Sequence, residues 1–193
     1  MKMKKCSLIP VLVIICILLF SGNVHAQRYL PGQKAIQIIG GTTDGDWTFA
    51  SYHTGIAYST HTRSGNRWLF GAELLSSESS VNNFKLPISQ ITGEAGYYFN
   101  FLSDRNKNLF FSLGFSALSG YETVNWGNKT LSDGSLITDR DRFIYGGAVS
   151  FEIEAYLTDR IALLLNVKER CLWGSDIGTF HNQIGVGIKY VLK

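Results

Sequence analysis

Apolar and polar residues alternate one by one along most of the chain after residue 30. The clearest case ends the chain, where Ile184, Val186 and Ile188 share one face. Gly185 and Lys189 lie on the opposite face. A period of two residues is typical of β-strands, and no comparable helical period occurs in this part of the sequence. The alternation predicts eight strands, at about residues 35–41, 51–59, 68–74, 91–101, 109–122, 143–157, 161–173 and 183–192.

The two faces of these strands differ in size as well as in polarity. One face carries Leu, Ile, Phe and Tyr, and the other carries mainly Gly, Ser, Ala and Thr with isolated charges. Small residues suit the narrow lumen of an eight-stranded barrel, and large apolar residues suit a lipid-facing wall. The sequence therefore predicts an all-β fold, an eight-stranded antiparallel outer-membrane-type β-barrel. A soluble periplasmic β-barrel that binds a ligand is the alternative.

The expected connections between strands fall into two alternating sets. One set is short and turn-like: 61–67, 103–108 and 158–160. The other set includes the two longest connections: 44–46, 76–87, 127–141 and 174–179. Tight turns at one end and longer loops at the other end are the plan of an outer-membrane barrel.

The alternation assigns a set of charged side chains to the lumen: Glu73, Glu94, Glu122, Glu152, Glu154, Lys168, Arg170 and Lys189. The opposite register would place Lys168 and Arg170 in lipid, where a basic side chain at mid-bilayer costs about 2–4 kcal/mol. The chosen register leaves Glu169 facing outward, near the outer edge of the apolar band. We expect Glu152 and Glu154 to pair with the two cations of the neighbouring strand and so fill the lumen.

Two further patterns favour a membrane barrel. Aromatic residues gather near the expected strand ends, as in interfacial girdles: Trp47, Trp68, Phe101, Tyr121, Trp126, Phe143 and Trp173. The last strand, QIGVGIKY at 183–190, follows the assembly signal of outer-membrane barrels, with three residues after the final aromatic.

The first 26 residues predict a secretory signal peptide. Three lysines precede an apolar core at 8–20, which is too short to span a bilayer. Val24 and Ala26 supply the small residues of a cleavage site. We expect cleavage after Ala26, export to the outer membrane, and a single barrel domain at 27–193, with an uncleaved anchor as the alternative.

Charge changes the picture once this leader, residues 1–26, is set aside. The chain has 18 Lys and Arg against 15 Asp and Glu, and the excess of three equals the lysines of the leader. A formally neutral mature chain excludes strong electrostatic binding of nucleic acid. Cys171 remains alone after cleavage, so no disulfide framework is expected.

Catalytic and cofactor chemistry is not indicated. The mature chain holds only His53, His61 and His181, of which His53 alone is expected inside the barrel. The sequence has no Gly-x-Ser-x-Gly motif, and three scattered histidines with one cysteine form no metal set. We expect no catalytic, cofactor-binding or metal residues and no small-molecule ligand. An outer-membrane lipid enzyme built on His53 is the alternative.

Six runs carry a resemblance to a known family: FNFLSD (99–104), GYETVNWG (120–127), FIYGGAV (143–149), YLTDRI (156–161), LLLNV (163–167) and GVGIK (185–189). Together they resemble the TraO family of conjugal transfer proteins from conjugative transposons of Bacteroides-type bacteria. The likeness covers nearly the whole mature chain, and 42–60 is its least typical part.

The resemblance implies a non-enzymatic component of an apparatus that transfers DNA between cells. It brings no catalytic or ligand residues. The implied partners are outer-membrane lipid and other envelope proteins of the conjugation apparatus, without direct binding of nucleic acid. A general small outer-membrane barrel, of the adhesion or envelope-stability type, is the alternative function.

Overall fold

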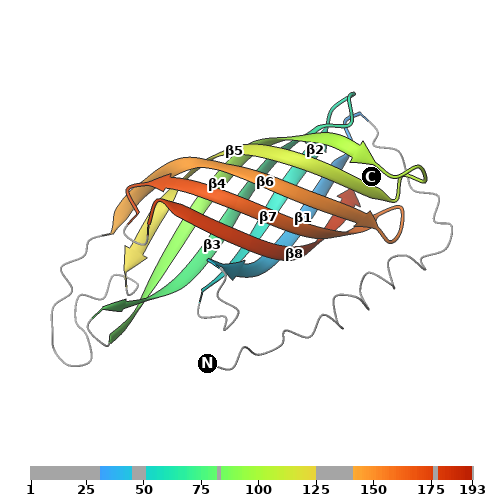
Figure 1. The fold of residues 1–193 in the computed structure, drawn as a ribbon. Coiled ribbons are helices and arrows are strands. Elements are labelled where there is room, and N and C mark those ends of the chain that lie inside the picture. The colour runs from blue at the N-terminus through green and yellow to red at the C-terminus, as the bar shows by residue number, and fades with distance from the viewer. Residues whose placement is uncertain (1–30, 45–50, 82–83, 125–140, 176–177, 193) are drawn as a thin grey trace, which may run out of the picture.

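Eight antiparallel strands form a closed barrel, in which each strand pairs with the next and the last pairs with the first (Figure 1). A computed structural model describes residues 31–44, 51–81, 84–124, 141–175 and 178–192. The strands are β1 (Lys34–Thr43), β2 (Tyr52–His61), β3 (Arg67–Val81), β4 (Phe84–Ser103), β5 (Leu109–Val124), β6 (Arg142–Tyr156), β7 (Ile161–Trp173) and β8 (Phe180–Leu192). The predicted fold class is confirmed.

Several expected features lie outside the described residues. They are the signal peptide, Trp47, Trp126 and nearly all of the connection at 127–141. Where the structure describes the chain, no helix has both the length and the apolar character needed to cross a membrane.

The predicted facing of the strands is confirmed where the alternation was clearest. Along β7 buried and accessible residues alternate, so that Lys168 and Arg170 point into the lumen and Glu169 points out. The same alternation holds along β8, where Lys189 is fully buried and Val186 is 66% exposed. The barrel is therefore apolar on its outer wall and polar inside.

The three short connections meet at one end of the barrel, which we name the turn end. At the β2–β3 turn, the Thr62 amide donates to the Asn66 carbonyl at 2.7 Å, and Gly65 adopts a positive φ of 80° that favours glycine. The β4–β5 and β6–β7 turns close through Asp104 and Leu157, whose amides each donate a backbone hydrogen bond of 2.9 Å. The described chain also starts and finishes at this end (Figure 1). We name the opposite end the loop end.

The connection expected at 76–87 is wrong, because this segment continues two strands. β3 runs on to Val81 and β4 starts at Phe84, and the pair projects from the loop end (Figure 1). Pairing of β4 with β5 begins at Ile88. Pro87 therefore pairs with β3 alone, and its other side is an edge of the sheet. Proline is tolerated at such an edge, and a strand outside the apolar band needs no apolar face, which explains the missed prediction.

A β-bulge near the turn end of β4 places two consecutive apolar residues on the outer wall. The pairing with β5 shifts between Asn100 and Leu102, so Phe101 and Leu102 are both exposed. The bulge adds aromatic and apolar surface where the wall approaches the turns.

Exposed aromatic rings gather at both ends of the outer wall. The rings near the loop end are Tyr52, Tyr121, Phe143, Tyr145, Trp173 and Phe180. Those near the turn end are Tyr58, Trp68, Phe99, Phe101 and Tyr190. The aromatic residues predicted for the two ends are confirmed there, except the two outside the described residues.

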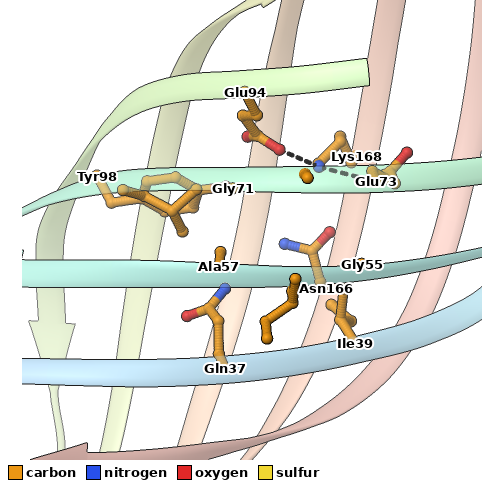
Figure 2. Close-up of a pocket in the computed structure, with 13 residues that line it drawn as sticks. Gln37, Ile39, Gly55, Ala57, Gly71, Glu73, Glu94, Tyr98, Asn166 and Lys168 are labelled. Carbon is orange, nitrogen blue, oxygen red and sulfur yellow. Dashed lines mark hydrogen bonds and ion pairs between the residues drawn. The ribbon is translucent and has the colours of Figure 1, made fainter. Parts of the chain in front are cut away.

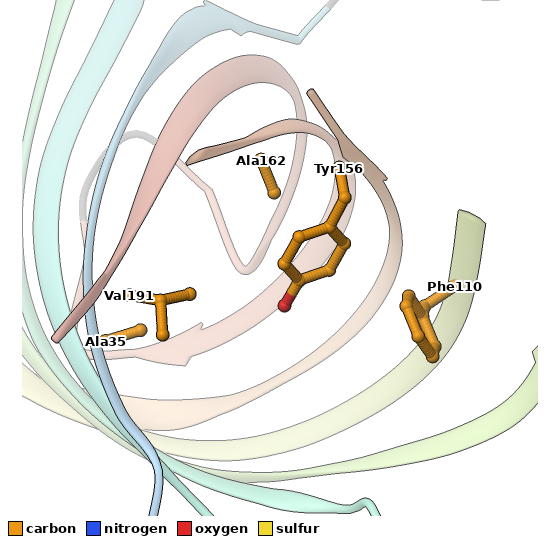
Figure 3. Close-up of a cluster of buried hydrophobic side chains, with 5 residues drawn as sticks. All are labelled: Ala35, Phe110, Tyr156, Ala162 and Val191. Carbon is orange, nitrogen blue, oxygen red and sulfur yellow. The ribbon is translucent and has the colours of Figure 1, made fainter. Parts of the chain in front are cut away.

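Small apolar clusters occupy the lumen near each end. Ala35, Phe110, Tyr156, Ala162 and Val191 fill the turn end, with the Phe110 and Tyr156 rings 5.6 Å apart (Figure 3). A second cluster nearer the loop end contains Leu118, Ile144, Ala148 and Leu172. Most of the charged side chains of the lumen lie between these two clusters, and Glu122 lies nearer the loop end.

A tyrosine ring stacked on a glycine fills the lumen next to the charges. Tyr98 on β4 pairs with Gly114 on β5, and its buried ring covers the glycine. A Cβ at Gly114 would lie 2.5 Å from the Tyr98 ring. The Arg67 guanidinium sits 4.6 Å from the centre of the same ring. Gly114 therefore provides the space that orients Tyr98.

We predict that Gly114→Ala destabilises the barrel by about 1–3 kcal/mol, because the added methyl overpacks the lumen. The matched control is Gly93→Ala on β4, where a Cβ meets its nearest neighbour at 3.7 Å. Urea unfolding in detergent micelles, followed by the gel shift between folded and boiled forms, measures the difference. Equal stabilities for the two variants would contradict this account of Tyr98.

Candidate functional site

Eight of the inward charges form two compact clusters that are each formally neutral. The turn-side cluster contains Arg67, Glu152, Glu154 and Lys189. The loop-side cluster contains Glu73, Glu94, Lys168 and Arg170. Each cluster has two cations and two carboxylates, and all eight side chains are at least nine-tenths buried. Burial on this scale is tolerated because each charge is paired and hydrogen-bonded.

The loop-side cluster joins opposite walls of the barrel. Lys168 Nζ on β7 lies 2.7 Å from Glu94 Oε2 and 3.1 Å from Glu73 Oε2, as Figure 2 shows. Arg170 donates to Glu73 Oε1 at 3.0 Å, and Gln183 donates to the same oxygen at 2.7 Å. In an eight-strand ring β7 stands opposite β3, so the Lys168–Glu73 contact spans the lumen.

The turn-side cluster is built around a forked arginine. Arg67 on β3 donates from its two terminal nitrogens to Glu152 and Glu154 of β6. Lys189 of β8 donates to both oxygens of Glu154 at 2.9 Å. A guanidinium suits two carboxylates at once because its donors lie in one rigid plane. This cluster closes the lumen between the apolar turn end and Tyr98.

The expected pairing of these charges is wrong, although their inward facing is right. Glu152 and Glu154 do not pair with the cations of β7; their described ion-pair partners come from β3 and β8. Across the β6–β7 ladder, Lys168 stands opposite Ser150 instead. The β6–β7 register places Asn166 opposite Glu152 and Leu164 opposite Glu154, so no cation of β7 stands directly across from either carboxylate. The cations that reach them come from β3 and β8.

A third polar network lies nearer the loop end. Gln90 on β4 and Ser175, just after β7, both donate to Glu122 Oε2 of β5, each at 2.7 Å. Glu122 is 1% exposed, so its prediction as a lumen residue is confirmed. The network connects Ser175 to β4 and β5 at the loop end.

A small cavity of about 30 Å³ lies beside the loop-side cluster (Figure 2). Gln37, Tyr98, Asn166 and Lys168 contribute polar groups to its wall. Its volume suits one or two water molecules and is far too small for an organic ligand.

The three histidines do not gather into a catalytic site. His53 is buried, with Nδ1 3.5 Å from the Thr43 hydroxyl. His61 Nδ1 lies 3.2 Å from the Gln33 carbonyl at the turn end. His181 Nδ1 lies 2.9 Å from the Asp44 carboxylate. His61 and His181 are buried like His53, so the expectation that His53 alone faces inward is wrong.

Arg67 lies in the lumen, although it falls within the turn expected at 61–67. It lies one step beyond the alternation of β3, in which Leu69 and Glu73 also face inward. Extending that alternation by one position would have found it. Within the described parts of the chain, no group of three or more His, Cys, Asp and Glu is placed to hold a metal ion.

We predict strong coupling between Lys168 and Glu94. Lys168→Met leaves the Glu94 carboxylate without its cation and should cost about 3–5 kcal/mol in unfolding free energy. Adding Glu94→Gln removes the stranded charge and should recover a large part of that loss. Urea unfolding of the two single variants and the double variant in micelles measures the coupling, and simple additivity would contradict the ion pair.

The barrel is similar to solved outer-membrane barrels. The chain matches Neisserial surface protein A with a TM-score of 0.57 at 11% identity, covering 81% of this chain and 96% of that one. It matches the Yersinia pestis attachment invasion locus protein Ail, in complex with the heparin analogue sucrose octasulfate, with a TM-score of 0.56 at 11% identity, covering 84% and 100%. The N-terminal barrel domain of Pseudomonas aeruginosa OprF gives 0.52 at 10% identity, covering 84% and 98%.

At these identities the likeness shows the fold alone, which is an outer-membrane-type barrel. Among curated proteins, no sequence matches this chain. A family model described as conjugative transposon protein TraO matches residues 30–192, which include all eight strands. The chain therefore belongs to the TraO family of conjugative transposon proteins.

Proposed function

We propose that this protein is a non-enzymatic outer-membrane component of a conjugative DNA-transfer apparatus, acting through contacts with other envelope proteins. Membership of the TraO family carries the proposal, since the family description places it among conjugative transposon proteins. The barrel fold supports an envelope location, because an apolar outer wall bounded by aromatic rings suits a bilayer.

The filled lumen supports a function carried out by the outer surface of the barrel. It argues against a function as a channel for DNA. Lys168 touches Glu73 and Glu94 from the opposite wall, and Arg67 touches Glu152 and Glu154 at a second level. Side chains in direct contact across the barrel leave no width for a DNA strand. Contacts made by the outer wall and by the loop end are therefore the means of action that we propose.

Export by the leader is part of the same proposal. The signal peptide at 1–26 would deliver a mature barrel, 27–193, through the inner membrane and into the outer membrane. Outer-membrane lipid then covers the outer wall between the aromatic residues of the loop end and those of the turn end. Neither nucleic acid nor a small-molecule ligand has a place in this proposal.

We predict that the protein fractionates with the outer membrane and that its mature form begins at Gln27. N-terminal sequencing of the purified protein tests the cleavage site. The folded barrel should need detergent for solubility and should shift in gel mobility on boiling, because a closed barrel resists the detergent until heated. A protein that stays folded and soluble without detergent would instead support the periplasmic ligand-binding barrel.

We predict that a clean deletion of the gene in the donor lowers mating frequency severely and that a complementing copy restores it. A copy encoding only residues 27–193 after a start codon is the matched control, since it lacks the leader and should not restore transfer. Unchanged transfer after deletion would overturn the proposal and favour a general outer-membrane barrel with an adhesion or stability role.

A further inference from the structure

Glu169 is a charged side chain that faces outward from within a strand. It is exposed on β7, between the half-buried or exposed apolar positions Val167 and Cys171. Among the strand residues whose side chains the structure describes, the other exposed charges, Lys34 and Arg142, occupy the first positions of β1 and β6. Among the strand residues with described side chains, Glu169 is therefore the exposed charge that lies away from a strand end.

The depth of Glu169 makes the charge costly in plain lipid. Trp173, four positions further along β7, belongs to the girdle of exposed aromatic residues at the loop end. With about 3.3 Å per residue and a tilt of about 40°, Glu169 lies roughly 10 Å from that girdle, measured along the barrel axis toward the turn end. Aromatic side chains mark the membrane interface, so Glu169 does not lie at the outer edge of the apolar band, where it was expected. Its carboxylate lies within the hydrocarbon layer, where ionisable residues are unfavourable and commonly functional.

The described part of the chain supplies no cation to Glu169. Its neighbours across the two ladders are Val149 on β6 and Asn182 on β8. Asn182 is exposed on the same wall and offers an amide beside the carboxylate. The inward cations of β7, Lys168 and Arg170, are committed to Glu73 and Glu94 on the other side of the wall.

Two small residues lie next to Glu169 on the outer wall. Gly147 and Cys171 are paired across β6 and β7, on the loop-end side of Glu169. Beyond them the Tyr145 and Trp173 rings stack with centres 6.1 Å apart. We name the residues Gly147, Val149, Glu169, Cys171 and Asn182 the Glu169 patch. It is a partly polar area that contains two small residues, Gly147 and Cys171, and is bounded by Tyr145, Trp173 and Phe180. Small residues on a membrane-facing surface favour the close approach of another chain.

We propose that the Glu169 patch docks a membrane-embedded segment of another envelope protein that presents an Arg or Lys side chain to Glu169. Charge complementarity identifies this occupant, because a desolvated carboxylate is stabilised by a cation brought to the same depth. This inference rests on the outer-membrane placement proposed above.

The other occupants of the patch lack the required chemistry. A second copy of this chain offers no outward cation at this depth among its described residues, since Lys34 and Arg142 lie at the strand ends. Cationic lipid headgroups remain at the interface, which is roughly 10 Å away by the climb along β7. A partner protein can carry its cation into the hydrocarbon layer on a packed segment.

Site-specific photo-cross-linking tests the occupant directly. A photoreactive residue replaces Asn182 in the patch, or Thr54 on β2 as the outward control on another wall. In donor cells the Asn182 probe should cross-link to a membrane segment of a different protein that contains Arg or Lys, identified by peptide sequencing. The yield should fall at least about tenfold in a Glu169→Leu background, as expected for loss of a desolvated charge pair.

Cross-links from position 182 to lipid alone, or to a second copy of the chain, would overturn the inference. So would equal cross-linking to the same segment from positions 182 and 54, because the contact would then not be located at the patch. A cross-link whose yield is unaffected by Glu169→Leu would show that the charge is not what recognises the partner.

Mating assays separate this inference from the proposed function. Glu169→Leu replaces a charge by an apolar residue that lipid favours, so the barrel should fold as well as the parent or better while mating frequency falls. Thr54→Leu makes a similar polar-to-apolar change on β2 and should alter neither. If deletion of the gene abolishes transfer but Glu169→Leu transfers normally, the docking inference fails alone. If deletion has no effect, the proposed function fails, and the cross-linking result still decides the docking inference.

Discussion

The narrowness of an eight-stranded lumen governs the rest of this structure. Opposite walls lie within reach of two side chains, so every inward charge must find its partner inside the barrel. The chain meets this demand with two neutral clusters, in which Lys168 reaches from β7 to β3 and β4 and Arg67 reaches from β3 to β6. These contacts brace walls that the backbone ladders connect only through their neighbours. The lumen is thereby filled by the protein's own side chains.

The sequence was sufficient to predict features that depend on neighbouring residues alone. Alternation along β7 placed Lys168 and Arg170 inside and Glu169 outside, and the structure agrees at each position. The same reasoning located the tight turns near Ser103 and Thr158, because turn residues there interrupt the alternation. A period of two residues is a local property of a strand, so a single sequence records it fully.

Features that depend on closure of the barrel could not be read in this way. The partners of Glu152 and Glu154 are set by the tilt and stagger of eight strands, which no local pattern reveals. Arg67 was missed because it stands next to a turn, where alternation has only begun. The β3–β4 extension was missed because, beyond the apolar band, a strand has no reason to be apolar on one face. For the candidate site, sequence supplied most members but not their arrangement.

The pairing of β1 with β8 has a consequence for how the protein comes into existence. Lys34 is paired with Leu192, so the first strand of the barrel cannot complete its pairing until the last strand is in place. Until β8 arrives, two unpaired edges expose their backbone groups to chaperones, proteases and other chains. A premature stop codon before β8 would therefore leave the barrel open along β1 and β7.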